Sequence, residues 1–329
     1  MGGTAWSRLR LLAGATILVG VLWRLGTGPL LHGLHRIDGR ALLAAMLIGA
    51  LTTVCAAWRW SLVAGNLGVR LSLPAAVAAC YRSQLLNVTL PGGVLGDVDR
   101  AMRHGRDTGD LSRAARAVGW DRVAGQVVQG ALAVAVLFSI ESPLRSATPM
   151  IVLAMAISAV GAGCAIRLVL RRGASGPARL LATAGTDIRR GLLARPTWPA
   201  VLAMSVLVVF GHTATFMIAA RTAGATGPLS QLLPLALLVL LAMAVPMNVG
   251  GWGPREGAAA WLFAITGLGA EQGLATATVY GVLAIVASLP GAAVLVTTRL
   301  RQGTWQTHAG SVSRRSALAA AGPKGVARG

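Results

Sequence analysis

Long apolar runs separated by short charged segments repeat along most of the chain. A helix needs about 20 apolar residues to cross the hydrocarbon core of a membrane. The runs predict seven to nine membrane segments, within residues 11–23, 41–58, 71–96, 123–140, 146–166, 196–220, 222–254, 257–270 and 272–298. We therefore expect an all-α fold, a polytopic integral membrane helical bundle.

Two of these runs contain glycine and proline clusters that break a helix. Residues 71–96 end in Pro91-Gly92-Gly93-Val94-Leu95-Gly96, and residues 222–254 end in Val249-Gly250-Gly251-Trp252-Gly253-Pro254. Irregular backbone at membrane depth is tolerated only where protein buries it or it lines a cavity. The sequence therefore predicts two broken or re-entrant helices.

Basic residues indicate how the chain is oriented, because cytoplasmic loops carry an excess of Arg and Lys. Residues 100–122 hold six Arg, residues 167–195 hold seven, and the tail from residue 299 holds six basic residues. If all three stretches are cytoplasmic, the run 71–96 enters and leaves on the cytoplasmic side. The stretch 230–270 then enters and leaves on the external side, and Arg24, Arg36 and Arg40 lie outside.

Paired interrupted segments in two halves of a chain are typical of a transporter built as an inverted repeat. Helix N-termini at such breaks have free N–H groups and a positive dipole end. The helices expected to begin near Asp97 and Arg255 each offer an anion site. Four arginines could add guanidinium groups suited to phosphate, namely Arg82, Arg100, Arg103 and Arg255. Asp97, Asp99 and Glu256 are expected to act as counter-ions or as partners for a cationic head group.

Structural roles stay open for the same residues. One alternative is that the glycines have no role beyond letting helices pack closely. Another is that Arg255 and Glu256 form a purely structural pair. Arg82 could likewise simply snorkel toward the head groups. A charged pair within the membrane is costly and is functional by default. The two breaks taken together therefore favour a functional interpretation.

Other polar residues within the apolar runs are predicted to be structural. Arg59 and Trp60 end the run 41–58 in the manner of an interfacial anchor. His212 is expected to be a hydrogen-bonded packing residue. Asp121 and Arg122 open the run 123–140, where they can pair with each other at the interface.

Composition excludes several classes of protein. Hydrophobic residues make up 55% of the 329 residues and charged residues 12%, whereas soluble domains have about 25% charged residues. The net charge of +20 comes with only 5% aromatic residues, which argues against nucleic-acid binding. Cys55, Cys80 and Cys164 are too widely spaced for a disulfide framework or a metal site. No metal, cofactor or catalytic motif is predicted, so we expect no enzyme activity.

Three motifs resemble those of the lysylphosphatidylglycerol synthase transmembrane (flippase-like) family. They are Leu86-Asn87-Val88-Thr89-Leu90-Pro91-Gly92-Gly93-Val94-Leu95-Gly96-Asp97 with Arg100 after it, Gly119-Trp120-Asp121-Arg122, and Pro246-Met247-Asn248-Val249-Gly250-Gly251-Trp252-Gly253-Pro254-Arg255-Glu256. The resemblance covers roughly residues 9–301. It implies a flippase-type membrane domain, found alone or fused to a cytosolic aminoacyl-transferase domain. The chain departs from the family in having Asp97 where members often have Glu.

These observations predict residues 1–301 as one flippase-like transmembrane domain and residues 302–329 as a disordered basic cytoplasmic tail. The tail is too short to hold an aminoacyl-transferase core. We expect a multi-pass protein of a bacterial plasma membrane that moves an anionic or aminoacylated phospholipid, or a polyprenyl-phosphate-linked lipid, between leaflets. The alternative is a non-transporting accessory or scaffold protein for lipid or cell-envelope glycan synthesis, with a lipid-modifying synthase or a glycosyltransferase as partner.

The residues predicted to bind lipid lie at the two breaks and at the entry to the run 123–140. They are Arg82, Asn87, Pro91, Gly92, Gly93, Gly96, Asp97, Arg100, Asp121, Arg122, Asn248, Gly250, Gly251, Arg255 and Glu256.

Overall fold

The computed structural model describes residues 16, 19–90, 93–140, 149, 183–243 and 252–298. The regular elements in these ranges are helices, as predicted. They are α2 (Gly28–His35), α3 (Gly39–Asn66), α4 (Leu73–Thr89), α5 (Leu95–Thr108), α6 (Leu111–Ser139), the π-helical turn η2 (Ile188–Leu192), α9 (Trp198–Thr222), α10 (Leu229–Ala242), α11 (Pro254–Ile265) and α12 (Ala270–Ser288). The predicted run 146–166 apart from residue 149, residues 11–15, 17 and 18 of the run 11–23, and the tail 302–329 lie outside the described residues.

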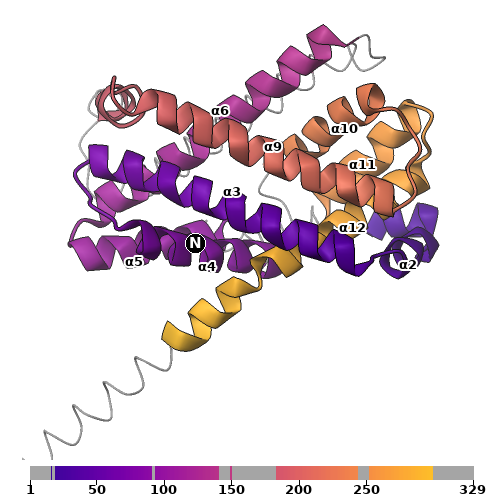
Figure 1. Cartoon of the computed structure of the whole chain (residues 1–329), viewed down its shortest axis with the longest axis horizontal. Helices are drawn as coiled ribbons and strands as arrows, with labels where there is room; N and C mark the ends of the chain where they lie inside the picture. The colour runs from indigo at the N-terminus through magenta and orange to yellow at the C-terminus, as the bar shows by residue number, and fades with distance from the viewer. Residues whose placement is uncertain are drawn as a thin grey trace, which may run out of the picture.

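Four helices in the described part of the chain are long and apolar enough to cross a membrane. They are α3, α6, α9 and α12, the last continuing after a turn at Leu289 as a helix to residue 298. This final stretch points away from the bundle (Figure 1, yellow). The chain is therefore a multi-pass helical membrane protein, with α10 as a further short apolar helix.

Contacts between helix ends define two ends of the bundle. We call the end where α3 finishes and α6 begins the basic end, because residues 100–122 near it hold six Arg, and we call the opposite end the far end. At the basic end, α3 finishes beside η2, because Asn66 Nδ2 donates to Gly191 O at 3.0 Å and to Thr197 Oγ1 at 2.8 Å. At the far end, the carbonyl of Ala223 accepts from Arg36 Nη1 at 3.2 Å and from Gln272 Nε2 at 3.0 Å. The four long helices thus run in two directions: α3 and α12 run toward the basic end, and α6 and α9 run away from it (Figure 1).

The shorter helices form two hairpins that enter from opposite ends. α4 and α5 leave and return at the basic end, where Gly105 near the end of α5 packs against Leu111. α10 and α11 leave and return at the far end, where Gln231 Nε2 donates to Thr266 O at 2.8 Å. The units α3–α6 and α9–α12 have the same order of span, hairpin and span with opposite direction, which is the arrangement of an inverted repeat.

Both hairpins reach toward the middle of the bundle. Gln84 of α4 accepts from Thr53 Oγ1 at 3.1 Å, and Thr53 lies halfway along α3. In the other hairpin, Leu237 of α10 packs with Val209, which is near the middle of α9. The residues after each break are therefore held deep between the spans.

Local sequence explains where the hairpins begin and end. Asp110 caps α6, accepting from Arg113 N at 2.9 Å, and Gly109 ends α5 with φ of 74°. α6 thus begins at Leu111, well before the apolar run predicted to start at residue 123, because a capped polar segment continues the helix outside the apolar part. α11 begins at Pro254, because proline is favoured in the first turn of a helix.

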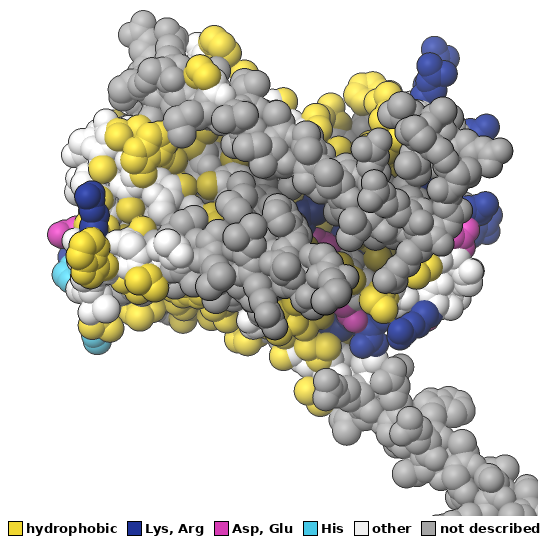
Figure 2. Space-filling model, turned by 180° about the vertical axis from the view of Figure 1, so that it is seen from behind, with side chains coloured by type: hydrophobic (Ala, Val, Ile, Leu, Met, Phe, Trp, Pro, Cys, Tyr) yellow, Lys and Arg dark blue, Asp and Glu magenta, His cyan; other side chains and the backbone are white. Residues whose placement is uncertain are grey.

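Each unit has a core of its own. One cluster, in α3 to α6, includes Ala57, Trp60, Ala76, Cys80 and Ala117. A larger one is formed mainly by α9 to α12. Figure 2 shows hydrophobic side chains mainly over the left and lower parts of the visible face, and most of the visible Lys and Arg side chains toward one end, at the right of that view.

Candidate functional site

A connected network of buried charges joins α3, α5 and α6 at the first hairpin. Asp121 Oδ1 accepts from Arg59 Nε at 2.8 Å, and its Oδ2 accepts from Arg100 Nη2 at 3.2 Å. Arg100 Nη2 also lies 3.3 Å from Asp97 Oδ1, and Arg122 pairs with the other oxygen of Asp97. The side chains of Arg59, Arg100 and Asp121 keep only 7%, 6% and 4% of their exposure. Each buried charge therefore depends on its partners for the solvation that water would otherwise give.

A second set of charges adjoins the first. Asp99 pairs with Arg82 at 2.6 Å and with Arg103 at 3.0 Å. Arg82 is buried, whereas Arg103 keeps 37% of its side-chain exposure. We call the two sets together the arginine cluster, composed of Arg59, Arg82, Arg100, Arg103 and Arg122 with Asp97, Asp99 and Asp121.

Polar side chains of α4 fix the start of α5. The backbone N–H of Gly96 donates to Asn87 Oδ1 at 2.8 Å, and Ser83 Oγ donates to Asp97 Oδ1 at 3.1 Å. A Cβ at Gly96 would collide with the carbonyl of Ser83, so glycine is required for this approach. Gly93 has φ of 60°, which also favours glycine. Pro91 and Gly92 lie outside the described residues.

The positive end of α5 already has an acid beside it. Asp97 lies in the first turn of the helix, where a carboxylate is stabilised by the helix dipole. Burial opposes its ionisation, but Arg122 and Arg100 outweigh burial and hold the pKa of Asp97 below its ordinary value of 3.8. An anionic ligand at this end would therefore bind through the arginines more than through the helix terminus.

Three buried polar atoms beside the network have no hydrogen-bond partner. They belong to Trp60 Nε1, Arg100 Nε and His104 Nε2. The side chains meet in one place: the guanidinium carbon of Arg100 lies 4.5 Å from the Trp60 ring centroid, and the rings of Trp60 and His104 are 5.4 Å apart. A buried polar atom without a partner costs about 1–3 kcal/mol, so this packing leaves hydrogen-bonding capacity unused.

The second break is organised differently, around one ion pair. Glu256 Oε1 accepts from Arg255 Nε at 2.8 Å and also from Arg255 Nη2, while its Oε2 accepts from Gly253 N at 2.7 Å. Glu256 is fully buried and Arg255 nearly so. Both carboxylate oxygens are satisfied within α11 and its cap, as in a capping box.

Aromatic rings surround the guanidinium of Arg255. Its central carbon lies 5.3 Å from the ring centroid of Trp252 and 5.6 Å from that of Tyr280. Gly281 packs against the same group, and a Cβ there would collide with it. The described part of the second break is thus neutral overall and closely packed.

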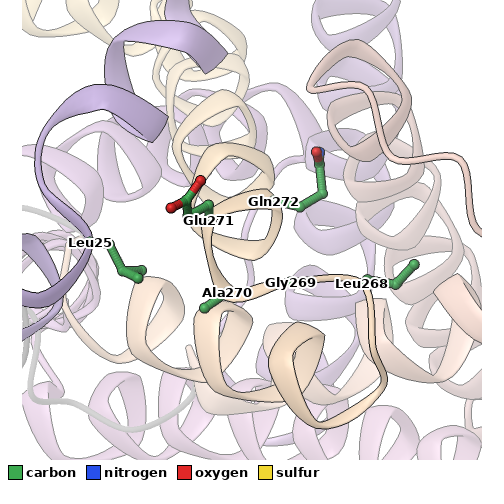
Figure 3. A pocket seen from close by; sticks show the side chains of 6 residues that line it. All are labelled: Leu25, Leu268, Gly269, Ala270, Glu271 and Gln272. Carbon is green, nitrogen blue, oxygen red and sulfur yellow. The ribbon is translucent and has the colours of Figure 1, made fainter.

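A recess of about 460 Å³ opens at the far end (Figure 3). It is lined by Leu25, Leu268, Gly269, Ala270, Glu271 and Gln272. Glu271, the charged residue among these six, is exposed at the start of α12. The recess is remote from the arginine cluster, which lies toward the basic end.

The structure brings together many of the residues predicted from sequence. Asp97, Arg100, Asp121 and Arg122 meet in one network, and Asn87 and Gly96 meet each other beside it. Arg82 lies close by, paired with Asp99, so it does not snorkel. Arg255 and Glu256 pair with each other, and within the described residues neither pairs with Asp97 or Arg100. Asn248, Gly250 and Gly251 lie outside the described residues.

The prediction of an interfacial anchor at Arg59 and Trp60 was wrong. Both side chains are buried, because α3 continues past residue 58 to Asn66 and turns these two residues toward α5 and α6. Asp121 and Arg122 do not pair with each other: Asp121 binds Arg59 and Arg100, and Arg122 binds Asp97. His212 is hydrogen-bonded as predicted, with Nδ1 3.3 Å from the Tyr280 hydroxyl, but it is exposed on the bundle and not packed within it.

Sequence reasoning missed several members of the site. Arg59, Trp60, His104, Ser83 and Ser205 had been given no binding role. Ser205 of α9 accepts from Arg59 Nη1 at 3.1 Å, and so joins the network to the second unit. The sequence did contain a signal for this network, because Arg59 follows one apolar run and Asp121 stands at the start of a later one. Each of these charges needs a partner within the membrane.

The sequence motifs around these residues agree with one family. The family model described as the lysylphosphatidylglycerol synthase TM region matches residues 9–291. The chain belongs to this family of membrane proteins, whose name ties it to lipid metabolism. No curated protein matches the chain.

Proposed function

We propose that this protein is a non-enzymatic transporter of a bacterial plasma membrane that moves a phosphate-bearing lipid between leaflets. Its cargo belongs to the anionic or aminoacylated phospholipids or to the polyprenyl-phosphate-linked lipids. The observation that carries the proposal is the pair of hairpins that enter from opposite ends and hold buried charges between the spans.

Opposed hairpins suit a mechanism of alternating access. A head group bound at the first break is reached from the basic end, because α4 and α5 open there. A movement of α3–α6 against α9–α12 would close that path and open another beside α10 and α11. No lipid head group then needs to cross the hydrocarbon core unaccompanied.

The contact between the two units supports such movement. α3 and α9 pack through small residues, and a Cβ at Gly211 of α9 would collide with Thr52 of α3. Gly49 of α3 approaches Ala287 of α12 in the same way, since a Cβ there would lie 2.6 Å from the alanine methyl carbon. Small residues give close but smooth helix interfaces in membranes.

Reconstitution into liposomes tests this function. Vesicles with purified protein and a trace of a head-group-labelled lipid are treated with a membrane-impermeant quencher, and the loss of inner-leaflet signal reports translocation. We expect loss of the inner-leaflet signal for at least one phosphate lipid, and slower loss with Arg122→Gln. Arg113→Gln is the matched control, because Arg113 pairs with Asp110 at the surface, away from the arginine cluster.

Two results would overturn the proposal. One is that no lipid from the three classes moves faster than in empty liposomes. The other is that Arg122→Gln, shown to be folded by its elution as one species, moves every lipid at the wild-type rate. A chain that binds a synthase or glycosyltransferase but fails both tests would be an accessory protein.

A further inference from the structure

The arginine cluster carries more positive charge than its acids neutralise. It contains five arginines and three aspartates, an excess of two positive charges. Arg106 and Asp107, which follow on α5, are both exposed and add one charge of each sign. An excess of this size in a partly desolvated site favours a bound counter-ion, because charges taken out of water need partners.

On this basis, and resting on the proposed function, we infer that the arginine cluster binds a doubly charged phosphate monoester at the end of a lipid. A monoester carries about −1.5 to −2 charges at neutral pH. It therefore matches the excess of the cluster. A phosphodiester such as phosphatidylglycerol carries a single negative charge, and a lysyl ester of it carries additional positive charge.

Unused donors within the cluster give independent support. Trp60 Nε1 and Arg100 Nε can only donate hydrogen bonds, and both are buried without an acceptor. His104 Nε2 is also unpartnered, and it donates or accepts according to its protonation. Obligate donors are satisfied by an acceptor, and phosphate oxygens are strong acceptors.

The cluster is partly accessible from outside the protein. Arg122 keeps 30% of its side-chain exposure and Arg103 keeps 37%, whereas Arg59, Arg82 and Arg100 are buried. A phosphate would therefore first meet Arg103 and Arg122. Guanidinium groups bind phosphate oxygens in a bidentate way.

The second break does not compete for this ligand. Arg255 is neutralised by Glu256, and aromatic rings flank its guanidinium. Its carboxylate partner would repel a dianion. The two breaks are thus unequal in charge, and the first break is the one that selects the phosphate.

Binding to purified protein tests the inference without requiring transport. Native mass spectrometry in a neutral detergent measures the affinity for phosphatidic acid, phosphatidylglycerol and lysyl-phosphatidylglycerol with matched acyl chains. We expect phosphatidic acid to bind at least about tenfold more tightly than either of the others at pH 8, a difference of about 1.4 kcal/mol. We expect Arg103→Gln and Arg122→Gln each to weaken it by about tenfold, since hydrogen bonds between two charged groups are stronger than those between neutral groups. Arg113→Gln should leave it unchanged.

The pH dependence separates a dianion from a monoanion. The second ionisation of a phosphate monoester has a pKa of about 6, so binding of phosphatidic acid should weaken between pH 8 and pH 5. Phosphatidylglycerol has no such step. The charged and titratable protein groups around the cluster, namely His104, Asp107, Cys80 and its three aspartates, are the same in both experiments, so the comparison of the two lipids isolates the contribution of the ligand.

Three results would overturn the inference. Phosphatidylglycerol or its lysyl ester could bind as tightly as phosphatidic acid, Arg113→Gln could weaken binding as much as Arg103→Gln, or the affinities of the two lipids could change equally with pH. A competition experiment with inorganic phosphate, added at the concentration of the lipid, tests whether the cluster binds the free anion instead of the lipid. If it displaces phosphatidic acid completely, the ligand is free phosphate and the lipid assignment fails.

Failure here is distinguishable from failure of the transport proposal. Selective binding of phosphatidic acid without movement in liposomes would overturn transport and leave the binding inference standing. Movement of a diester or a lysyl ester without selective binding of the monoester would overturn only the inference.

Discussion

Arg59 on α3 and Asp121 on α6 form an ion pair of 2.8 Å in which both side chains are more than nine-tenths buried. The same aspartate binds Arg100 on α5, and the same arginine binds Ser205 on α9. Two residues thus connect the first hairpin to both neighbouring spans and to the second unit. A ligand that moves Arg59 would therefore also disturb its hydrogen bond to Ser205 of α9.

Replacing Asp121 should be strongly destabilising. Asp121→Asn leaves Arg59 and Arg100 buried without their shared carboxylate, and breaking a buried pair costs about 3–5 kcal/mol. The midpoint of thermal unfolding in detergent, followed by tryptophan fluorescence, measures the effect. Arg113→Gln breaks an exposed pair and should change stability by less than about 1 kcal/mol. Equal effects of the two substitutions would show that the network is not a structural centre.

The pair at the second break should behave as one unit. Arg255→Gln or Glu256→Gln alone leaves one buried charge without its partner, which we expect to cost about 3–5 kcal/mol. The double variant Arg255→Gln with Glu256→Gln has no such charge and should recover much of the loss. Unfolding midpoints of the four proteins form a double-mutant cycle. Additive losses would mean that the two side chains do not depend on each other.

Close helix approach in the first hairpin should not tolerate a methyl group at Gly96. A Cβ at this position would collide with the backbone carbonyl of Ser83, and overpacking costs about 1–3 kcal/mol. Gly65→Ala in α3 is the control, because no atom lies within 4 Å of a Cβ there. It should be neutral or slightly stabilising, since alanine favours a helix by up to about 1 kcal/mol. Proteolysis of the hairpin would report its loosening directly.

Acid should destabilise the first hairpin in two steps. Burial, together with nearby Arg100, lowers the pKa of His104 below 6.5 despite the opposing charge of Asp107. The unfolded chain therefore binds a proton that the folded chain resists, and stability falls as pH drops below 6.5. The pKa of Asp97 is held below 3.8, so its stabilising contribution is present above 3.8 and is lost as pH falls through the lowered value.

A histidine variant separates these steps. His104→Gln should reduce the change in unfolding midpoint between about pH 7 and about pH 5 while the loss at lower pH remains. A wild-type midpoint that is constant over the upper range would contradict the prediction for His104.

Cysteine labelling should place both ends of the first hairpin on one face. Arg70 precedes α4 and Arg106 lies near the end of α5, and both are exposed. In a background without Cys55, Cys80 and Cys164, single cysteines at these two positions should react with an impermeant maleimide from the same side. A cysteine in place of exposed Glu271 should react from the opposite side. Labelling of positions 70 and 106 from different sides would mean that the hairpin crosses the membrane.

The sequence by itself determined the class of the protein and the direction of its hairpins. Apolar runs of span length require helices, because lipid cannot satisfy backbone polar groups. The glycine clusters around Gly93 and before Gly253 required breaks, since helix propensity fails there. The concentration of arginine in residues 100–122 and 167–195 indicated which ends lie together, and the contact of Arg116 with Asp187 at 2.8 Å agrees with it.

Only the tertiary structure decided which charges meet. Arg59 and Asp121 are 62 residues apart, and no periodicity links them, because the pairing depends on how α3 packs against α6. The difference in charge between the two breaks also could not be predicted from the sequence, since both present glycines followed by an acid and an arginine. In the structure Arg255 is neutralised by its neighbour Glu256. Arg100 instead pairs with Asp97 of α5 and with Asp121 of α6, and Asp121 also pairs with Arg59 of α3. Sequence spacing fixes contacts within a helix, whereas buried ion pairs between helices depend on the packing of the whole bundle.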